Sequence, residues 1–507
     1  MKSCLRFALL LFPWLACTAL ASAQTLSPDL PTWWVKYQSL LKNGSGIAGA
    51  AASSFAVGAN VDVSNECGPQ SETFVTLNAS SPNMLTAGSN EIFRLPMRGY
   101  FSSDGGSTWG GVDLPLPPPI GTNGVNFGSD PSLASDTRGT VFYGYIVVYF
   151  SAVFNTTGRG NGINGTELAV ARSTDGGKTW PQATFFSFSG GKDHFNDKPM
   201  ITVDTNPTSP FRDNVYVAWD AASGGSTSGG IRVGRSSDHG VTFSVDRADD
   251  SAGPGRSIGA VPFVGPEGNL YVAWNDHSAN VIAFNRSVDG GVTWDTRRII
   301  SPKVIPFAIG IPAESFRGAL VYPACDADRS AGPHRGRLYC SWMDLTPAGT
   351  TDIFLSFSDD QGTNWSPPAP VTDQLPAPVD RFNHWLSVDS VTGDVNISFY
   401  DTRNDTTGFR FQTDVFFTHS TDGGMTFSSP NLRVTTESSN EHDCNGLFPC
   451  PGINYGNQYG DYEGLVSFNR VSHPVWTDSR RQLQPSTGCS TNLLMEEVFT
   501  AAVKSSD

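Results

Sequence analysis

The sequence predicts an all-β protein built from a repeated four-stranded unit, and three observations support this fold class. First, the 507 residues include 53 glycines and 34 prolines, which interrupt strands and form turns. Second, aromatic residues make up 11% of the chain, and these favour strands. Third, one short motif recurs along most of the chain, which is the signature of a repeat architecture.

The repeated motif reads Ser-x-Asp-x-Gly-x-Thr-aromatic, and the fifth copy replaces Thr by Asn364. Its Asp can accept hydrogen bonds from the backbone of its own turn, and its Gly supplies a positive φ. A catalytic group is needed once, whereas a turn is needed in every repeat. We therefore expect a structural role for its aspartates, which are Asp104, Asp175, Asp238, Asp289, Asp360 and Asp422.

Each motif copy is expected to follow a short strand directly, such as 168–172 or 281–285, and to precede another. Two further strands are expected before these, which makes four strands in each unit. The expected pairs, in chain order, are 72–77 with 83–87, 132–134 with 141–148, 199–203 with 214–219, 260–263 with 270–274, 320–322 with 338–342, and 386–388 with 395–400. A seventh unit, made of 464–468, 474–477 and 493–503, has no motif and only three strands.

Radial repetition of four-stranded sheets predicts a seven-bladed β-propeller, with six blades as the alternative if one unit is misread. A propeller must close, so we expect residues 55–63 to supply the missing strand of the last unit. The propeller would then cover residues 55–507, after an N-terminal segment at 24–54.

Residues 1–23 have the pattern of a signal peptide. Lys2 and Arg6 precede the apolar run 7–15, and Ala21-Ser22-Ala23 fits a cleavage site. No other segment is long and apolar enough to span a membrane. The expected location is therefore secreted or periplasmic. The alternative is a lipoprotein anchored at Cys17.

Six cysteines remain after this processing, and an even number in an exported chain indicates disulfides. Cys325 and Cys340 lie in one expected hairpin, and Cys444 and Cys450 bracket a short loop. This leaves Cys67 and Cys489, near the two ends of the propeller, as the third pair. No C-x-x-C spacing suggests zinc instead.

The six motif copies resemble the Asp-box, or BNR repeat, of the sialidase/neuraminidase superfamily, which is also found in xyloglucanases and sortilin-type receptors. The resemblance covers about residues 72–503 and implies the propeller fold. It does not imply the reaction, because the boxes are features of the fold.

Alternating strand directions place the Asp-boxes on one face of a propeller. The opposite face collects the beginnings of inner strands and the ends of second strands. The polar side chains expected there are Glu72, Asp130, Asp197, Arg256, Glu314, Arg381 and Tyr462 for the inner strands, Asn90, Asp220, Asp276, Asp344, Asp401 and Asp478 for the second strands, and Arg317, Arg403, Arg480, His194, His277 and His384 close by. Many of them can also cap turns.

The resemblance implies a tyrosine nucleophile, an activating Glu and arginines that hold a substrate carboxylate. Tyr462 and Glu314 match the catalytic positions. The candidate substrate-binding residues are Arg317, Arg381, Arg403, Arg480, Asp197 and His384. The first inner strand begins Ser71-Glu72-Thr73 where sialidases carry an Arg, so no complete arginine triad can be assigned.

The net charge is −15. The chain as a whole therefore lacks the basic character of a nucleic-acid binder, and this class of protein is excluded. We expect an exported, monomeric propeller that binds a glycan or another extracellular macromolecule opposite the Asp-boxes. The alternative function is a sialidase-like glycoside hydrolase. No cofactor and no metal ligands are assigned, although Asp and Asn at a channel mouth would suit Ca²⁺.

Overall fold

The computed structural model describes eleven stretches of the chain. These are residues 55–66, 68–92, 94–117, 125–150, 163–190, 196–221, 230–249, 257–375, 378–442, 459–480 and 496–505. Every helix or strand assigned in these stretches is a strand.

The described strands form eight antiparallel sheets, seven with four or more strands and one with two. The seven larger sheets follow one another along the chain and are called blades 1 to 7. Blades 1 to 3 contain β3 (Gln70–Asn78), β4 (Ser81–Glu91), β5 (Arg98–Ser102) and β6 (Gly110–Asp113), then β7 (Val125–Ser135), β8 (Val141–Phe150), β9 (Ile163–Ser173) and β10 (Gln182–Gly190), then β11 (Asp197–Val203), β12 (Val215–Asp220), β13 (Ile231–Ser236) and β14 (Ser244–Arg247).

The remaining blades keep the same order of strands. Blades 4 to 6 contain β15 (Ser257–Val264), β16 (Leu270–Asp276), β17 (Val281–Ser287) and β18 (Arg298–Pro302), then β21 (Ala324–Ala327), β22 (Leu338–Leu345), β23 (Thr351–Ser358) and β24 (Ala369–Pro370), then β25 (Arg381–Val388), β26 (Val395–Asp401), β27 (Gln412–Ser420), β28 (Leu432–Arg433) and β29 (Ser439–Asn440). Blade 7 contains β30 (Gly464–Phe468), β31 (Val471–Asp478), β32 (Glu497–Thr500) and β33 (Val503–Ser505), together with β1 (Phe55–Val57) and β2 (Val61–Asp62).

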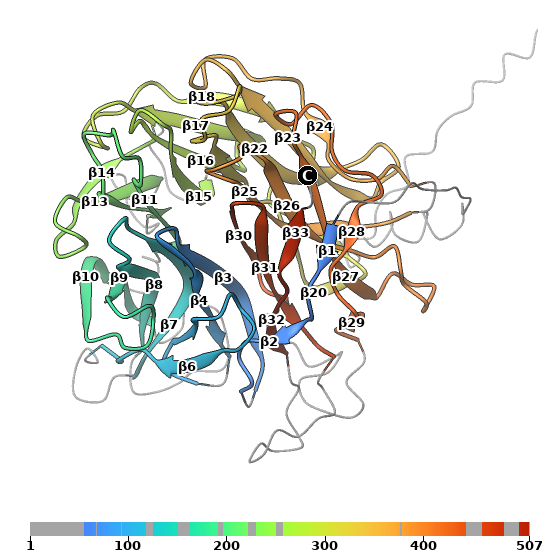
Figure 1. Ribbon diagram of the computed structural model, residues 1–507, viewed down its shortest axis with the longest axis horizontal. Coiled ribbons are helices and arrows are strands. Elements are labelled where there is room, and N and C mark those ends of the chain that lie inside the picture. Colours follow the sequence, from blue (N-terminus) through green and yellow to red (C-terminus); the bar gives the residue numbers. More distant parts are fainter. Residues whose placement is uncertain are drawn as a thin grey trace, which may run out of the picture.

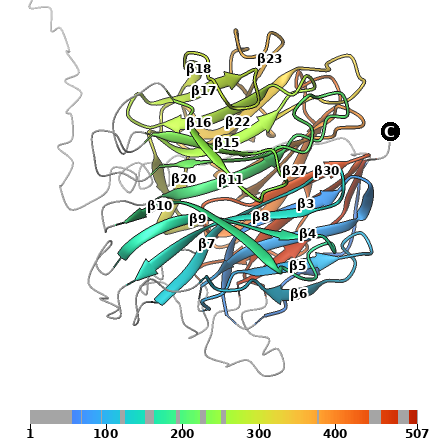
Figure 2. The ribbon, with the colours of Figure 1, turned by 90° about the vertical axis from the view of Figure 1, so that its left-hand side faces the viewer.

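The first strands of the seven blades form a closed ring. Each of β3, β7, β11, β15, β21 and β25 contacts the first strand of the next blade, and β30 contacts both β25 and β3. Figure 1 shows this circular order, and Figure 2 shows the ring from the side with blade 2 toward the viewer. The second strands β12, β16 and β26 are buried along their whole length because neighbouring blades cover both faces. The all-β propeller class is confirmed.

The fifth repeat differs from the prediction. Residues 320–322 were expected to form its first strand, but β20 (Glu314–Leu320) pairs with β19 (Ala308–Ile311) in the separate two-stranded sheet. The first strand of blade 5 is instead β21, and Cys325 lies opposite Cys340 on β22. The apolar run that suggested a strand at 320–322 is buried, but it continues the pairing with β19: Leu320 lies opposite Ala308, and the Val321 N–H donates to the Phe307 carbonyl at 2.8 Å.

The last blade is completed by the N-terminal end of the described chain. Val61 of β2 pairs with Thr500 of β32, and Phe55 of β1 pairs with Ser505 of β33. The outer edge of blade 7 is therefore split into two short strands. Cys325 and Cys340 form the expected disulfide. Cys67, Cys444, Cys450 and Cys489 lie outside the described residues.

The repeated turns have the hydrogen bonds that their sequence requires. In the first copy, Asp104 accepts from the Thr108 N–H at 2.9 Å and from the Thr108 hydroxyl at 2.6 Å, while the Ser102 hydroxyl accepts from the Gly106 N–H at 2.9 Å. The Gly105 N–H donates to the Asn83 carbonyl at 3.0 Å. Asn83 lies near the start of β4, so these turns lie at the same end of a blade as the connection between its first two strands.

Candidate functional site

The first strands carry a common backbone distortion at the end of the blade opposite the Asp-boxes. In blades 1, 2, 3, 4 and 6 the register between the first two strands shifts within the first strand. Each shift contains a residue in the left-handed region. These residues are Glu72 (φ 52°), Asp130 (φ 58°), Lys198 (φ 52°), Gly259 (φ 70°) and Asn383 (φ 42°).

A β-bulge of this kind re-aims a side chain, and a left-handed non-glycine residue costs about 1–3 kcal/mol. The backbone geometry recurs, as a feature of the fold does. The side chains do not recur, because the five positions hold an acid, another acid, a lysine, a glycine and an amide. The differences between them therefore cannot be explained by the needs of the fold.

Several of these side chains meet at the axis of the ring. The Lys198 Nζ, from blade 3, lies 3.2 Å from the ring centroid of Tyr462, just before β30 of blade 7. It also lies 4.0 Å from the ring centroid of Tyr322. The Tyr462 hydroxyl donates to the Pro131 carbonyl of blade 2 at 2.7 Å. Blades that are not neighbours in the ring can make such contacts only near its centre.

Arg317 interacts with acidic side chains from two other parts of the chain near the axis of the ring. Its Nε donates to the Asp461 carboxylate, and its Nη2 lies 3.8 Å from Oε1 of Glu72. The Tyr322 hydroxyl donates to Asp461 at 3.2 Å, and the Asn90 amide donates to Glu72 at 2.6 Å. We call the set Glu72, Asp130, Asp197, Lys198, Arg317, Tyr322, Asp461 and Tyr462 the central cluster.

Burial sets the protonation of the central cluster. It raises the pKa of Glu72 well above its usual value, helped by Asp130 and Asp461. Burial also raises the pKa of Asp197 well above its usual value, and a side-chain hydrogen bond joins this carboxyl to Asp130. Burial alone would raise the pKa of Asp461, but Arg317 outweighs it and lowers that pKa. The cluster therefore combines carboxyl groups whose pKa values are raised with one whose pKa is lowered.

Lys198 is the most unusual member of the cluster. Its side chain is buried, and burial lowers its pKa to about 8 although four carboxyl groups oppose this effect. Within the described stretches its Nζ has no hydrogen-bond partner. Two aromatic rings stabilise the ammonium group through their negative faces. A buried ammonium group with unused donors is costly to a fold.

The structure brings three of the predicted site residues into the cluster: Tyr462, Arg317 and Asp197. Glu314 does not begin a blade, as the sequence suggested, but begins β20 of the two-stranded sheet. Its carboxylate accepts from the Tyr459 N–H at 3.2 Å, and burial raises its pKa well above its usual value. In the part of the chain that the structure describes, no hydrogen bond joins Glu314 to Tyr462.

The other three predicted arginines are held by acidic residues of their own. Arg381 and Arg403 both donate to Asp401, at 2.9 and 2.6 Å. Arg480 donates to Asp478 at 2.7 Å. Of the four arginines, only Arg317 lies in the central cluster, so the described contacts do not assemble a common carboxylate clamp.

The predicted histidines have different positions. His384 is buried next to Asn383, and burial lowers its pKa to about 4. His277 packs against the ring of Phe307, with centroids 5.7 Å apart. His194 and Arg256 lie outside the described residues.

Lys198, Tyr322, Asn383 and Asp461 belong to the site or its rim but were not selected from the sequence. Lys198 directly follows Asp197, and a regular strand would point the two side chains to opposite faces. The bulge changes this alternation, and no residue pattern in the sequence predicts the bulge. The sequence predicts a strand at Tyr322, and it favours Tyr462 as a site residue over its neighbour Asp461.

Among the described residues, no group of three or more His, Cys, Asp or Glu side chains is arranged to hold a metal ion. The described residues contain no helix long and apolar enough to cross a membrane.

No protein-family model matches the chain, and no curated protein matches it. Among solved structures, it is similar to an intramolecular trans-sialidase from leech, with 14% identity over 67% of this chain and 65% of that one and a TM-score of 0.44. It is also similar to a variant of the NanB sialidase from Streptococcus pneumoniae, with 11% identity over 71% and 68% of the two chains and a TM-score of 0.46.

A third similar structure is a protein of unknown function from Dyadobacter fermentans, with 17% identity over 69% of this chain and 95% of that one and a TM-score of 0.43. The match to the leech enzyme spans less than two thirds of that enzyme's length. Likenesses at this level carry no information about activity.

Proposed function

We propose that this protein binds a glycan at the central cluster, on the face of the propeller opposite the Asp-boxes. The observation that carries the proposal is the repeated bulge with unlike side chains. Non-glycine residues adopt this costly backbone conformation in four blades, and three of them, Glu72, Asp130 and Lys198, belong to the mixed set of donors and acceptors around one axis.

The chemistry of this set suits a ligand rich in hydroxyl groups. Asp461 accepts, Lys198 and Arg317 donate, and the carboxyl groups with raised pKa values can do both when they are protonated. The rings of Tyr322 and Tyr462 are buried and hold the Lys198 ammonium group through their faces. Arg317 is partly accessible, with 23% of its side chain exposed, and would make the first contact.

The environment of Tyr462 favours binding over hydrolysis of sialidase type. A nucleophilic tyrosine is activated by a neighbouring base or by a lowered pKa. Here the Tyr462 hydroxyl donates to a backbone carbonyl, and burial raises its pKa well above its usual value. Both features keep the hydroxyl protonated.

An array of neutral and sialylated glycans, probed with the purified protein, tests the proposal. Arg317→Met should weaken binding to the glycan identified by about tenfold, because it removes a charge-assisted hydrogen bond. Arg235→Met is the matched control. Arg235 is also partly exposed and paired with one acid, Asp246, but it lies on the third strand of blade 3. Binding to no glycan, or equal losses in the two variants, would overturn the proposal.

Tyr462→Phe separates binding from hydrolysis. The variant keeps the ring beneath Lys198 and removes only the hydroxyl group. Glycan affinity should stay within about threefold of the parent value, since the hydrogen bond lost is internal to the protein. A hydrolase acting through this tyrosine would instead cleave a chromogenic sialoside, and the variant would lose that activity.

A further inference from the structure

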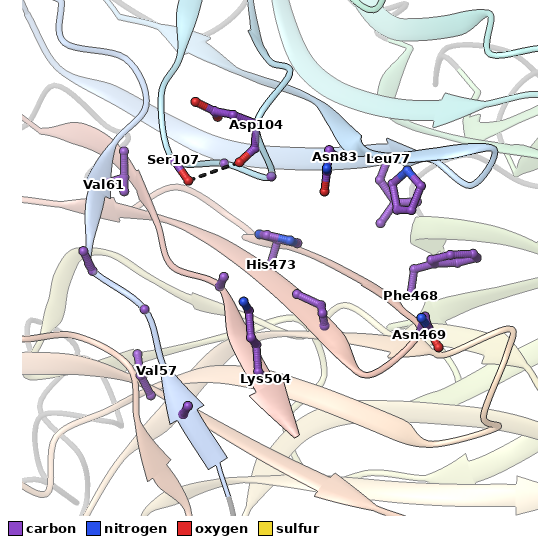
Figure 3. A pocket seen from close by; sticks show the side chains of 18 residues that line it. Val57, Val61, Leu77, Asn83, Asp104, Ser107, Phe468, Asn469, His473 and Lys504 are labelled. Atoms are coloured by element: carbon purple, nitrogen blue, oxygen red, sulfur yellow. Dashed lines mark hydrogen bonds between the residues drawn. The ribbon is translucent and has the colours of Figure 1, made fainter. Parts of the chain in front are cut away.

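A second site lies at the junction of the chain ends, on the Asp-box face. A cavity of about 660 Å³ lies between the N-terminal strands β1 and β2, the first Asp-box turn, and the β30–β31 turn of blade 7. We call it the seam pocket (Figure 3). Its volume is within the range of cavities that hold small organic ligands.

The seam pocket exists because blade 7 is built differently from the others. The outer edge of blade 7 is made of two short strands, and residues 58–60 connect them. Residues 501–502 likewise separate β32 from β33. The breaks leave space beside the first Asp-box.

His473 occupies a position that can be compared between blades. In blades 1, 2, 3 and 5, the matching residue of the second strand contacts the second glycine of the next blade's Asp-box. These residues are Thr86, Phe142, Tyr216 and Tyr339. In blade 7 the residue is His473, and a methyl group added to Gly106 would lie 3.5 Å from its Nδ1. Since apolar or hydroxyl-bearing side chains fill this position elsewhere, the fold does not require an imidazole.

The imidazole of His473 has an unused hydrogen-bonding atom. The residue is only 5% exposed, and its Nδ1 has no hydrogen-bond partner among the described residues. Burial, reinforced by Lys504, lowers its pKa to about 4, so the ring is neutral at pH 7. His473 lines the seam pocket, and a buried polar nitrogen without a described partner is a feature that a bound molecule can satisfy.

Lys504 supplies a positive charge to the same space. In Figure 3 its ammonium group points toward the His473 ring. No salt bridge involves Lys504 in the described stretches. Asp104 also lines the pocket, but its carboxylate accepts from Thr108 and Ser102 of its own turn. Val57, Leu77 and Phe468 provide apolar walls.

We propose that the seam pocket binds a small organic carboxylate, with its anionic group between Lys504 and His473 and its apolar body against the walls. The unpaired ammonium group selects an anion, and the apolar walls select against a bare inorganic ion. This site is independent of the central cluster, which lies at the opposite end of the blades.

Titration with phenylacetate tests the proposal, followed by NMR of protein labelled with ¹³C at histidine Cε1. The His473 resonance, assigned with a His473→Gln variant, should shift and saturate. Phenylacetamide has the same shape without the charge, and it should bind about tenfold more weakly.

Lys504→Met should weaken phenylacetate binding by about tenfold and leave phenylacetamide binding unchanged. Lys178→Met is the control, because Lys178 is an exposed lysine on the second Asp-box turn and should have no effect. Thermal unfolding checks that each variant is folded. An unmoved His473 resonance, equal affinities for acid and amide, or equal effects of the two lysine variants would overturn the proposal.

Discussion

The aspartate of each repeated turn has more hydrogen bonds than an exposed carboxylate normally makes. Asp289 accepts from the Ser287 hydroxyl at 2.7 Å, from the Thr293 hydroxyl at 2.5 Å, and from the N–H groups of Val292 and Thr293 at 3.1 and 2.8 Å. Asp289→Ala should lower the free energy of unfolding by about 1–2 kcal/mol, because several donors lose their acceptor. Urea titration measures this change. Glycan binding should be unaffected, and its specific loss at unchanged stability would contradict the structural role.

Two groups of carboxyls contribute to the stability of the protein with opposite dependence on pH. Burial raises the pKa values of Glu72, Asp197 and Asp220, so these groups bind protons more tightly in the folded state, and stability rises as the pH falls toward about 4.5. Hydrogen bonds lower the pKa values of Asp238 and Asp289 to about 2 against burial. Their contribution is present above about pH 4 and is lost as the pH falls toward 2.

The contribution of Glu72 and Asp197 is the difference in the free energy of unfolding between the parent protein and the double variant Glu72→Gln/Asp197→Asn, measured in urea from pH 2.5 to 8. The buried histidines His384 and His473, whose pKa values burial lowers to about 4, are present in both proteins and cancel from this difference. The difference should change in favour of the parent protein as the pH falls from 7 to about 4.5. A difference that does not change with pH would contradict this account.

At the scale of elements, each Asp-box turn packs on the blade before it. A Cβ added to Gly177 of blade 2 would lie 2.7 Å from the Thr86 methyl group of blade 1, and Gly177 has a φ of 89°. Gly408 has a similar φ of 77°, but nothing lies within 4 Å of its added Cβ. Gly408→Ala should therefore cost about 1 kcal/mol for backbone strain alone.

Gly177→Ala should cost about 1–3 kcal/mol more, because the methyl group overlaps Thr86. Chemical denaturation of both variants measures the difference. Equal losses would mean that contact between the turn and the preceding blade adds nothing to stability.

The repeated elements could be predicted from the sequence because each copy shows the same local chemistry. The turns at 102–109 and its five repeats, and the buried second strands, lie where the motif and the apolar runs place them. The fifth repeat was misassigned because the insertion that forms β19 and β20 contains an apolar run of its own. Apolar character indicates burial, but it does not say which partner strand is used.

The central cluster could be predicted only in part. The topology argument pointed to the end of the blades at which the cluster lies. It placed Glu72 and Asp130 there and selected Tyr462, Arg317 and Asp197 as candidates. It missed Lys198 because the left-handed residue within the bulge re-aims that side chain, and nothing in the local sequence marks the bulge. It also grouped Arg381, Arg403 and Arg480 with Arg317, although each has an acidic partner that only the fold brings to it.

At the scale of the whole molecule, the ring has one junction without an Asp-box. Blade 7 has no box to pack on blade 6, and Phe55 of β1 contacts that blade instead. Its ring centroid lies 5.9 Å from that of Phe417 and 4.3 Å from that of His419, both on β27. Phe243 of the third Asp-box makes a comparable contact with Phe186 on blade 2, at 4.4 Å.

Phe55→Ala should loosen the junction between blades 6 and 7. Hydrogen exchange followed by mass spectrometry should show faster exchange in β27, β31 and β33, because β1 loses its anchor. Phe188→Ala is the matched control, since Phe188 is half exposed on the outer strand of blade 2. It should leave these three strands unchanged. Faster exchange spread evenly over all blades in both variants would contradict a special role for Phe55.

The pairing of β1 with β33 also orders events during synthesis. Among the described strands, β1 is synthesised first and its partner β33 last, so β1 cannot pair until β33 has been made. Blades 1 to 6 have all their described strands in one contiguous stretch and can form earlier. The complete ring, and with it the seam pocket, can form only after β33 is available.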